Sequence, residues 1–406
     1  MKDTNKLNPE IRFSGFTDDW EQRKLGEVAK FINGRAYSQD ELLNNGKYKV
    51  LRVGNFYTND SWYYSDMELD DKYYAENGDL LYTWSATFGP HIWHGDKVIY
   101  HYHIWKINLS KSLEKTFALQ LLERDKEKIL ADKNGSTMVH ITKSGMENEK
   151  VLLPENIEEQ QKIGEYFSNL DRLITLHQRK LDKLKTLKKA MLEKMFPKNG
   201  ESVPEIRFSG FTDDWEQRKL GELGRATGGT SIESEFSENG KYKVISIGSY
   251  SEDSVYREQG IRAIESEKTK NRVLNEGDLT MILNDKTTSG NIIGRVLLIE
   301  KSDVYVYNQR TERIEINHDK FDSLFVYEML NAPQIRNKII KQSQGNTQIY
   351  VNWPAIAETR YLIPQIDEQQ KIGEYFSNLD RLITLHQRKL DKLKTLKKAM
   401  LEKMFI

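Results

Sequence analysis

The sequence has no cysteine among its 406 residues, which excludes disulfide bonds, thiolate metal sites and cysteine nucleophiles. Its first residues, MKDTNKLNPEIRF, contain no apolar signal core, and no stretch approaches the roughly eighteen apolar residues of a membrane span. Lys+Arg and Asp+Glu both number 61, so the zero net charge argues against an indiscriminate polyanion binder but allows local basic patches. We therefore expect a soluble cytoplasmic protein whose length accommodates two domains of ordinary size.

Signatures of catalysis and of nucleotide binding are also missing. The sequence has only 8 prolines, and no Asn or Asp precedes a Pro-Pro pair, as the adenine methyltransferase signature requires. There is no G-x-x-x-x-G-K-[ST] phosphate loop and no G-x-G-x-x-G behind a strand. These absences argue against a methyltransferase and against a nucleotide-binding enzyme.

The sequence is an internal repeat. Residues 9–27, PEIRFSGFTDDWEQRKLGE, recur letter for letter at 204–222, and the block 159–196 returns intact at 368–405. Between these constant blocks, residues 28–156 and 223–366 differ at nearly every position. Each half is therefore constant, variable and constant in turn, a pattern that predicts one scaffold presenting two different surfaces.

Each long constant block is predicted to be a single helix. Residues 159–196 contain no proline and one glycine, good helix formers dominate, and apolar residues recur at steps of three and four. At 1.5 Å per residue the helix would be about 57 Å long, which suggests a spacer rather than part of a domain core. The predicted coiled-coil seam consists of Ile163, Phe167, Leu170, Ile174, His177, Leu181, Leu184, Met191, Ile372, Phe376, Leu379, Ile383, His386, Leu390, Leu393 and Met400.

The only partner that every molecule provides for such a seam is the second copy of the helix. A pseudo-twofold, antiparallel pairing of the two helices is the simplest arrangement. His177 and His386 lie at the midpoints of their blocks, so an antiparallel pair would bring them together. The alternative is that both histidines turn to the solvated edge of the coiled coil.

The variable segments mix strands and helices. The first contains the β-rich stretches KYKVLRVGNFY, GDLLYTW and KVIYHYHIWKINL and a helix, KTFALQLLERDKEKIL, with Phe117, Leu121 and Leu122 inward. The second contains KYKVISIGSY, GDLTMIL, GRVLLIE and VYVYNQRTERIEI and a helix around 321–330. We predict an α+β fold with two tandem mixed domains joined by an antiparallel coiled coil of two long helices. The predicted boundaries are 1–156 and 204–366 for the variable domains, 157–197 and 367–406 for the helices, and 198–203 for the linker.

The order of these motifs resembles the specificity subunit of type I restriction-modification enzymes. The resemblance covers nearly the whole chain through WEQRKLGE, the glycine loops NGSTMVHITKSG and QGNTQIYVNWP, the following Leu-Leu-Pro or Leu-Ile-Pro, and EQQKIGEYFSNLDRLI. It implies that each variable segment is a target recognition domain for one half of a split double-stranded DNA sequence. The paired helices would then be a spacer and a platform for two modification subunits, and restriction subunits would join through the complex. S-adenosylmethionine, ATP and Mg would belong to these partner subunits, and this chain would not itself be an enzyme.

Candidate DNA contacts follow the strands and glycine loops of both variable segments. Hydroxyl, amide and aromatic groups can contact phosphates or base edges, and an Asn-Gln-Arg run suits adenine and guanine. Small residues in flexible glycine loops suit phosphate, and a lysine shared by both segments suits a backbone contact. The alternatives are an ordinary turn with a half-buried tryptophan in the first segment and a solvated strand end in the second. The candidates are Lys47, Trp84, Ser85, Thr87, His91, Asn134, Ser136, Thr137, Lys241, Asn284, Lys286, Thr287, Thr288, Asn308, Gln309, Arg310, Gln344, Asn346 and Thr347.

Other interpretations remain open. His101 and His103 would share one face of a strand near His91 and His94, which suggests zinc only weakly because no cysteine or fixed carboxylate ligand accompanies them. The basic run KLDKLKTLKKAMLEK is typical of a solvated coiled-coil flank, although it could also meet an acidic partner or DNA. The chain could also be a scaffold whose variable domains bind other proteins, or, less favourably, a methyltransferase itself.

Overall fold

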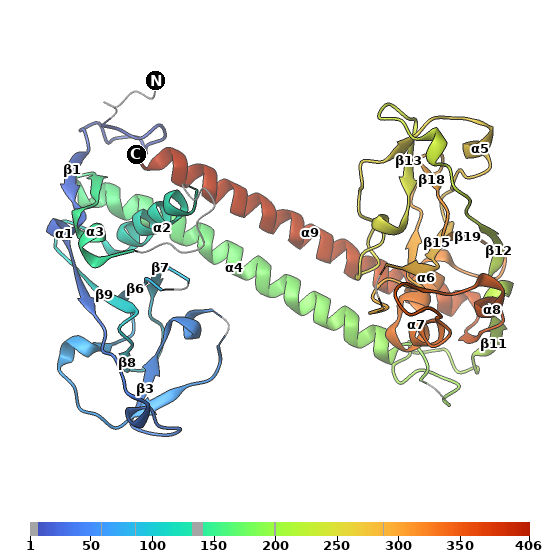
Figure 1. Ribbon diagram of the computed structural model, residues 1–406, viewed down its shortest axis with the longest axis horizontal. Coiled ribbons are helices and arrows are strands. Elements are labelled where there is room, and N and C mark those ends of the chain that lie inside the picture. Colours follow the sequence, from blue (N-terminus) through green and yellow to red (C-terminus); the bar gives the residue numbers. More distant parts are fainter. Residues whose placement is uncertain (1–6, 58, 86, 132–140, 199, 287) are drawn as a thin grey trace. The chain divides into compact units, whose positions relative to one another are not determined.

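The computed structural model describes residues 7–57, 59–85, 87–131, 141–198, 200–286 and 288–406. The chain divides into two compact units, which are described separately (Figure 1). The first unit comprises Met1–Gln178 with Arg388–Ile406, and the second comprises Arg179–Gln387. Each unit therefore contains one variable segment together with parts of both long helices.

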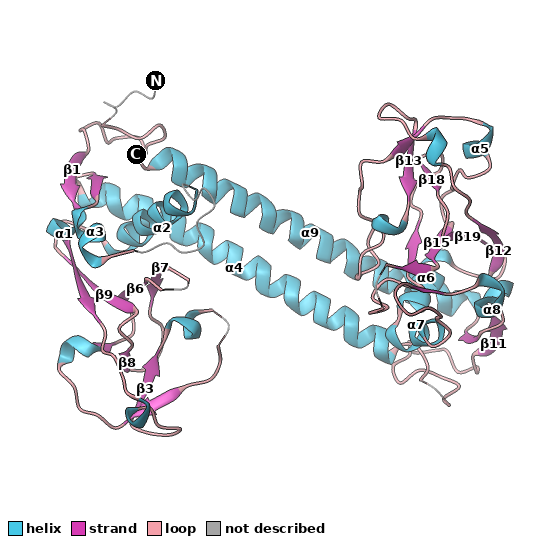
Figure 2. Ribbon diagram, in the orientation of Figure 1, coloured by secondary structure: helices cyan, strands magenta, loops and turns pink. Residues whose placement is uncertain are grey.

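The first unit contains two principal sheets, visible as magenta arrows in Figure 2. One is antiparallel, in the order β2-β9-β6-β7. The other has the order β4-β3-β8-β5, in which β3 and β8 are parallel. Their bounds are β2 (Ala29–Asn33), β3 (Tyr48–Leu51), β4 (Tyr63–Ser65), β5 (Tyr74–Ala75), β6 (Leu80–Thr83), β7 (Gly89–Ile92), β8 (Val98–Tyr100) and β9 (Ile104–Leu109).

The second unit repeats this topology with a different sequence. An antiparallel sheet has the order β12-β19-β15-β17, and a smaller sheet has the order β14-β13-β18, again with a parallel pair, β13 and β18. The two variable segments thus share one framework, as the common Gly-Lys-Tyr-Lys-Val and Gly-Asp-Leu motifs indicate. The bounds are β12 (Gly224–Gly228), β13 (Tyr242–Ile245), β14 (Arg262–Ala263), β15 (Leu279–Ile282), β17 (Val296–Leu298), β18 (Tyr305–Tyr307) and β19 (Thr311–Ile316).

The helices agree with the sequence-based expectations. The two constant helices are α4 (Ile157–Lys194) and α9 (Ile366–Met404), and the variable helices include α2 (Lys115–Ala131) and α6 (Ser323–Asn331). Phe117, Leu121 and Leu122 are buried on α2 as predicted. Shorter helices are α1 (Leu25–Val28), α3 (Lys143–Asn148), α5 (Glu267–Lys270), α7 (Pro333–Ile340) and α8 (Trp353–Ala357).

The long helices pack together in antiparallel fashion, and this predicted arrangement is confirmed (Figure 1). In the first unit, the start of α4 (Ile163, Phe167) packs in one cluster with Met404 at the end of α9, with Phe405 just after it and with Trp20. The second unit has the equivalent cluster, in which Ile372, Phe376 and Leu379 meet Leu184, Met195 and Phe196. The expectation that the helices lie outside any domain core is therefore wrong at their ends.

The rest of the predicted seam is buried to different degrees. Leu170, Leu181 and Leu390 are buried. His177 and His386 are each half-buried, and their contact with one another stays a prediction. The remaining seam positions, all half-buried, are Ile174, Met191, Ile383, Leu393 and Met400.

In each unit, the short constant block is joined to the long constant helix by a buried ion pair. In the first unit, the guanidinium of Arg12 donates to both carboxylate oxygens of Glu159, at 2.6 and 2.8 Å, and Glu159 is only 1% exposed. Arg207 and Glu368 repeat this pair in the second unit at 2.7 and 2.8 Å. Strand β1 (Glu21–Lys24) pairs with β10 (Lys150–Leu153), and β11 (Glu216–Lys219) with β21 (Arg360–Ile363). The ends of each variable segment are therefore fixed on constant residues.

The glycine in each constant helix marks where a variable helix packs against it. A Cβ at Gly164 would lie 2.0 Å from the Thr116 hydroxyl and 2.8 Å from the Phe117 nitrogen at the start of α2. A Cβ at Gly373 would lie 2.6 Å from an Asp322 oxygen, just before α6. Both distances are shorter than van der Waals contact, so only glycine allows this approach.

Candidate nucleic-acid interface

In the second unit, three of the predicted groups meet at one place. Strand β16 (Asn284–Asp285) pairs with β20 (Ile349–Tyr350), so the loop at 284–290 lies beside the glycine loop at 344–347. Between them, the Leu283 nitrogen donates to the Arg310 oxygen at 2.9 Å, and the Val351 nitrogen donates to the Leu283 oxygen at 2.9 Å. We call the exposed residues gathered here the second-unit cluster: Lys286, Thr288, Gln309, Arg310, Gln344, Asn346 and Thr347.

The side chains of this cluster suit nucleic acid. Arg310 and Lys286 are cations, and Gln309, Gln344 and Asn346 carry amides that donate and accept. The Gln309 amide donates to Glu233 at 3.3 Å. Asn284 is half-buried at the edge of the cluster, and Thr287 lies outside the described residues.

Two buried charged side chains, Arg336 and Asp285, form hydrogen bonds at the described ends of this loop, 284–286 and 288–290. The Arg336 side chain, 9% exposed, donates from Nε to the Ile293 oxygen at 3.0 Å and also hydrogen-bonds to the Gly290 oxygen. Burial lowers the pKa of Arg336 to about 10, so the guanidinium is charged at neutral pH. Asp285, 4% exposed, accepts from the Ile292 nitrogen at 3.0 Å. Such a preorganised loop loses little conformational freedom when it binds a ligand.

Asn308 does not belong to this exposed surface. It is 6% exposed, and its Oδ1 accepts from the Ile232 nitrogen at 3.1 Å. The structure assigns Asn308 to the inside of the domain, because its amide completes a backbone hydrogen bond there. Its neighbours Gln309 and Arg310 are exposed, and Arg310 has φ of 67°, a left-handed conformation that is uncommon outside glycine.

The structure separates Lys47 and Lys241 from the other candidates. Lys47 precedes β3, and Lys241 precedes β13 and lies 3.3 Å from Asp303, just before β18. Arg310 follows the opposite end of β18. Lys47 also pairs with Glu68, and Lys241 with Glu265. A contact of either lysine with phosphate stays a prediction, and phosphate would have to compete with these carboxylates.

In the first unit, the corresponding loop follows β6. The Trp84 indole is half-buried, stacks on Trp105 with ring centroids 5.8 Å apart, and donates from Nε1 to the Tyr102 oxygen at 2.9 Å. Ser85 is half-buried and Thr87 is exposed. The glycine-loop candidates Asn134, Ser136 and Thr137 lie outside the described residues.

His91 lies on strand β7 rather than in a loop. Its ring stacks on Phe56 with centroids 4.2 Å apart, and its Nε2 lies 3.1 Å from the Tyr57 hydroxyl. Burial, together with the nearby charge of Lys126, lowers the pKa of His91 to about 4. His91 is therefore neutral at physiological pH.

The prediction that His101 and His103 share one face of a strand is wrong. They belong to a tight turn between β8 and β9, closed by a hydrogen bond from the Ile104 nitrogen to the His101 oxygen at 2.9 Å. Tyr102 at its tip was not among the predicted DNA contacts. A gapless alignment of VIYHYHIWKINL with YVYNQRTERIEI would have placed it opposite Gln309. Among the described residues, no group of three or more His, Cys, Asp or Glu side chains is arranged to hold a metal ion.

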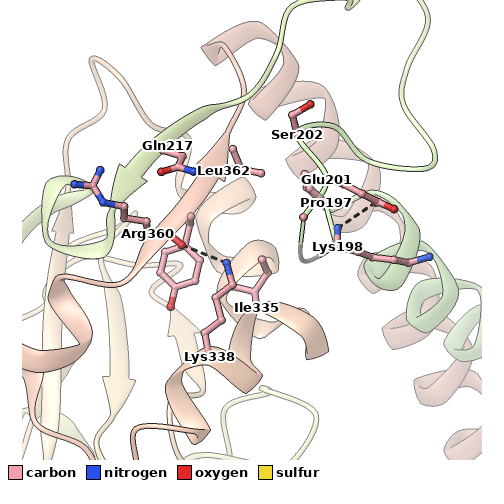
Figure 3. A pocket seen from close by; sticks show the side chains of 11 residues that line it. Pro197, Lys198, Glu201, Ser202, Gln217, Ile335, Lys338, Arg360 and Leu362 are labelled. Carbon is pink, nitrogen blue, oxygen red and sulfur yellow. Dashed lines mark hydrogen bonds between the residues drawn. The ribbon is translucent and has the colours of Figure 1, made fainter.

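A cavity of about 310 Å³ lies beside the linker that precedes the second short constant block (Figure 3). Lys198, Lys338 and Arg360 line it, but the Lys338 ammonium donates to the Arg360 oxygen at 3.3 Å and lies 5.3 Å from the centre of the Tyr361 ring. Lys198 pairs with Glu205 at 3.1 Å. Since two of its three cations are already engaged by protein groups, we do not include this cavity in the candidate interface.

Next to the Arg310 turn, Glu312 is a buried acid. It is 5% exposed, and burial raises its pKa to about 7, although the charge of Arg272 opposes this. A raised folded-state pKa means that its contribution to stability is fully present below the unfolded value of about 4.3. That contribution is lost as the pH rises through 7. Glu312→Gln should therefore raise the melting temperature, and by more at pH 8 than at pH 5.

Melting curves of the parent and of Glu312→Gln at both pH values test this prediction. At pH 8 the variant should be more stable than the parent by up to about 3 kcal/mol. Glu315→Gln is the matched control, because Glu315 lies on the same strand but is exposed. A gain that is the same at both pH values would show that Glu312 is already ionised in the folded protein.

Comparison with known proteins identifies the family. The model of the type I restriction modification DNA specificity domain matches residues 17–186 and again residues 212–395, once for each half of the chain. The chain belongs to this family. It is a specificity subunit with two specificity domains in tandem, and recognition of a DNA target is its general function. No helix in the described part of the subunit is long and apolar enough to cross a membrane.

Relatives and solved structures match over nearly the full length of the subunit. It is 26% identical to the type I restriction enzyme MjaVIII specificity subunit of Methanocaldococcus jannaschii, over 95% of this chain and 91% of that one. The putative MjaX specificity subunit of the same organism is 22% identical, over 95% and 92%. The crystal structure of a type I restriction-modification system S subunit from M. genitalium has a TM-score of 0.68 at 16% identity and covers 98% of this chain and 99% of that one. This likeness confirms the fold.

Proposed function

We propose that this subunit directs a type I restriction-modification complex to a bipartite DNA sequence, each variable domain reading one half-site. One observation carries the proposal: the strands common to the two units have the same order and register, yet different side chains lie exposed at equivalent places. In the second unit these are Gln309, Arg310 and Lys286, and in the first Tyr102 and Thr87. Base edges are distinguished by the hydrogen-bonding and apolar groups that meet them, so such units read different sequences.

We propose that the paired helices carry two modification subunits. Both helices expose leucines on surfaces that are otherwise strongly charged, and two of these positions recur in both copies, Leu176 with Leu385 and Leu187 with Leu396. In the first unit these are Leu173, Leu176 and Leu396, between 39% and 52% exposed. In the second unit, Leu385 and Leu187 are 44% and 40% exposed. Leu173 and Leu176 are three residues apart and therefore lie on one helix face, and contiguous apolar patches rimmed by polar residues mark protein interfaces. One solved structure with a TM-score of 0.51 comes from a study of complex assembly in the type I system.

The chemistry of the complex would belong to these partners. S-adenosylmethionine would bind to the modification subunits, and ATP and Mg to subunits of the complete complex. The specificity subunit would be non-catalytic, would contact double-stranded DNA, and would act in the cytoplasm together with the restriction subunits.

We propose that the helices also set the distance between half-sites. Inserting one heptad after Gln178 and another after Gln387 lengthens both helices by about 10 Å and preserves the seam. Since each base pair rises by 3.4 Å, the unread gap should lengthen by about three base pairs. Methylation mapping of the variant checks this, with single-alanine insertions elsewhere in the chain as controls for folding. An active variant with an unchanged gap would contradict a ruler role.

Arg310 is the strongest single candidate for base readout. Arg310→Ala should lower discrimination within one half-site by about 1–3 kcal/mol, because a bidentate contact to guanine would be lost. Lys241→Ala should instead weaken binding to all sequences and reduce the salt dependence. Arg225→Ala, another exposed arginine of the same unit, is the control. Binding of the complex to matched and mismatched duplexes over a salt series measures these effects, and equal losses on both duplexes would make Arg310 a backbone contact.

The proposed function as a whole is tested by mapping methylation in cells with and without this gene. We expect a split sequence motif that is methylated only when the gene is present. If no motif depends on the gene, and the variable domains bind protein rather than duplex DNA, the chain is a protein-binding scaffold. Binding of S-adenosylmethionine by the isolated chain would point to a methyltransferase.

A further inference from the structure

The turn at 101–103 in the first unit occupies the same place as the turn at 308–310 in the second. Each connects the parallel strand of the smaller sheet to the central strand of the larger one. Three backbone hydrogen bonds fix each turn at the same points of the framework. They are His101 to Leu51 (2.9 Å), Trp84 to His103 (3.1 Å) and Gly34 to Ile104 (3.0 Å), matched by Asn308 to Ile245 (3.0 Å), Leu283 to Arg310 (2.9 Å) and Gly229 to Thr311 (2.7 Å).

Both turns also rest on a glycine at the same position. A Cβ at Gly34 would lie 2.3 Å from the His101 oxygen, and a Cβ at Gly229 would lie 2.0 Å from the Asn308 oxygen. The framework thus places the tip residues of the two turns equivalently. Tyr102 corresponds to Gln309, and His103 corresponds to Arg310.

The first-unit turn presents the aromatic rings of Tyr102 and His103. The second-unit turn presents the polar side chains of Gln309 and Arg310 at the equivalent positions. Tyr102 is 38% exposed, and its ring centroid lies 3.8 Å from that of His103. The Trp84 indole supports both, since it donates to the Tyr102 oxygen and packs edge-on against His103 at 4.9 Å. The rings are therefore held in place while Tyr102 remains open to a ligand.

We propose that Tyr102 and His103 are the specificity-determining residues of the first unit and contact bases of its DNA half-site. This inference rests on the proposed function and names the site within it. The tyrosine ring offers an apolar face, of the kind that meets a thymine methyl group, and the imidazole offers hydrogen bonds to a base edge. Burial lowers the pKa of His103 and so favours the neutral ring, which has one donor and one acceptor nitrogen.

The test gives the first unit the tip residues of the second. A chain with Tyr102→Gln and His103→Arg, assembled with its modification subunits, is offered duplexes in which the first half-site is randomised and the second is fixed. We expect preference at one or two positions of the first half-site to move toward adenine or guanine by about tenfold. Preference within the second half-site should not change.

Controls keep the result interpretable. His94→Gln changes another exposed histidine of the same unit and should leave the preferred bases as in the parent. Tyr102→Phe keeps the ring, and should keep the preference even if the double variant folds poorly. Unchanged preferred bases with uniformly weaker binding in the double variant would overturn the assignment to the turn. A parent complex with no base preference in the first half-site would instead overturn the proposed function.

Discussion

A chain in which residues 223–366 replace residues 28–156, so that the second variable segment is present twice, should methylate a palindrome. Both half-sites would be copies of the second half-site in inverted orientation. The reason is that the constant helices are identical and antiparallel, so we expect the two positions on the scaffold to be equivalent. The reciprocal chain, with residues 28–156 present twice, should methylate a different palindrome built from the first half-site.

The structure indicates that such chains will fold. Each variable segment meets its scaffold through the same contacts: a strand pair, β1 with β10 or β11 with β21, and a helix start on Gly164 or Gly373. The scaffold also provides the same ion pair to both, Lys397 with Asp171 and Lys188 with Asp380, each at 2.6 Å. The first segment adds the Gln120 amide to this pair, and the second adds Glu328.

Exchanging the two segments between their positions is the matched control. On an equivalent scaffold the exchanged chain reads the same duplex from the other strand, so its methylated sequence should be that of the parent. The outcome that would defeat the model of two independent readers is a duplicated chain that still methylates the parental, asymmetric sequence.

The second large effect concerns stability. Arg12→Met should destabilise the first unit by about 3–5 kcal/mol, because it leaves the Glu159 carboxylate buried without its charged partner. The Trp20 indole, 3.4 Å from Glu159, supplies only one weak hydrogen bond. Arg207→Met should have the same effect on the second unit, because Arg207 and Glu368 have the same geometry and the same burial.

Denaturant unfolding and hydrogen exchange, which locates the loss in one unit, measure this effect. The matched control is Arg23→Met, since Arg23 and Glu21 form a pair that is about 40% exposed. Exposed pairs contribute about 0–1 kcal/mol. A double variant with Arg12→Met and Glu159→Met should recover part of the loss. If Arg12→Met costs no more than Arg23→Met, the buried pair does not hold the constant blocks together.

The sequence predicted those helices and strands that are determined by residues close together in the chain. The long helices and α2 follow from the periodicity of their apolar residues, and the shared framework follows from motifs that recur in both variable segments. The parallel pairing of β3 with β8 could not be predicted, since it joins strands separated by many residues and depends on tertiary packing. The core role of Phe167 and Phe376 was missed for a similar reason: a helical stripe does not tell which neighbour covers it.

The candidate site shows the same limit. Exposure of Gln309 and Arg310 could be guessed from a polar run after a strand, but the burial of Asn308 depends on the distant Ile232 nitrogen. Trp84 was correctly expected in a loop, whereas its support of Tyr102 through a backbone oxygen became visible only in three dimensions. Contacts between residues that lie far apart in the sequence, such as these two, position the side chains of the site and cannot be predicted from local patterns.

The backbone of Arg310 has a consequence for how this protein evolves. A left-handed residue with a Cβ typically costs about 1–3 kcal/mol where glycine costs little. Selection for stability alone would therefore favour glycine at this position. If Arg310 reads a base, as we propose, selection for that contact would oppose glycine. Lineages that no longer need the contact should then drift toward glycine, and position 310 would record whether the proposed half-site is still under selection.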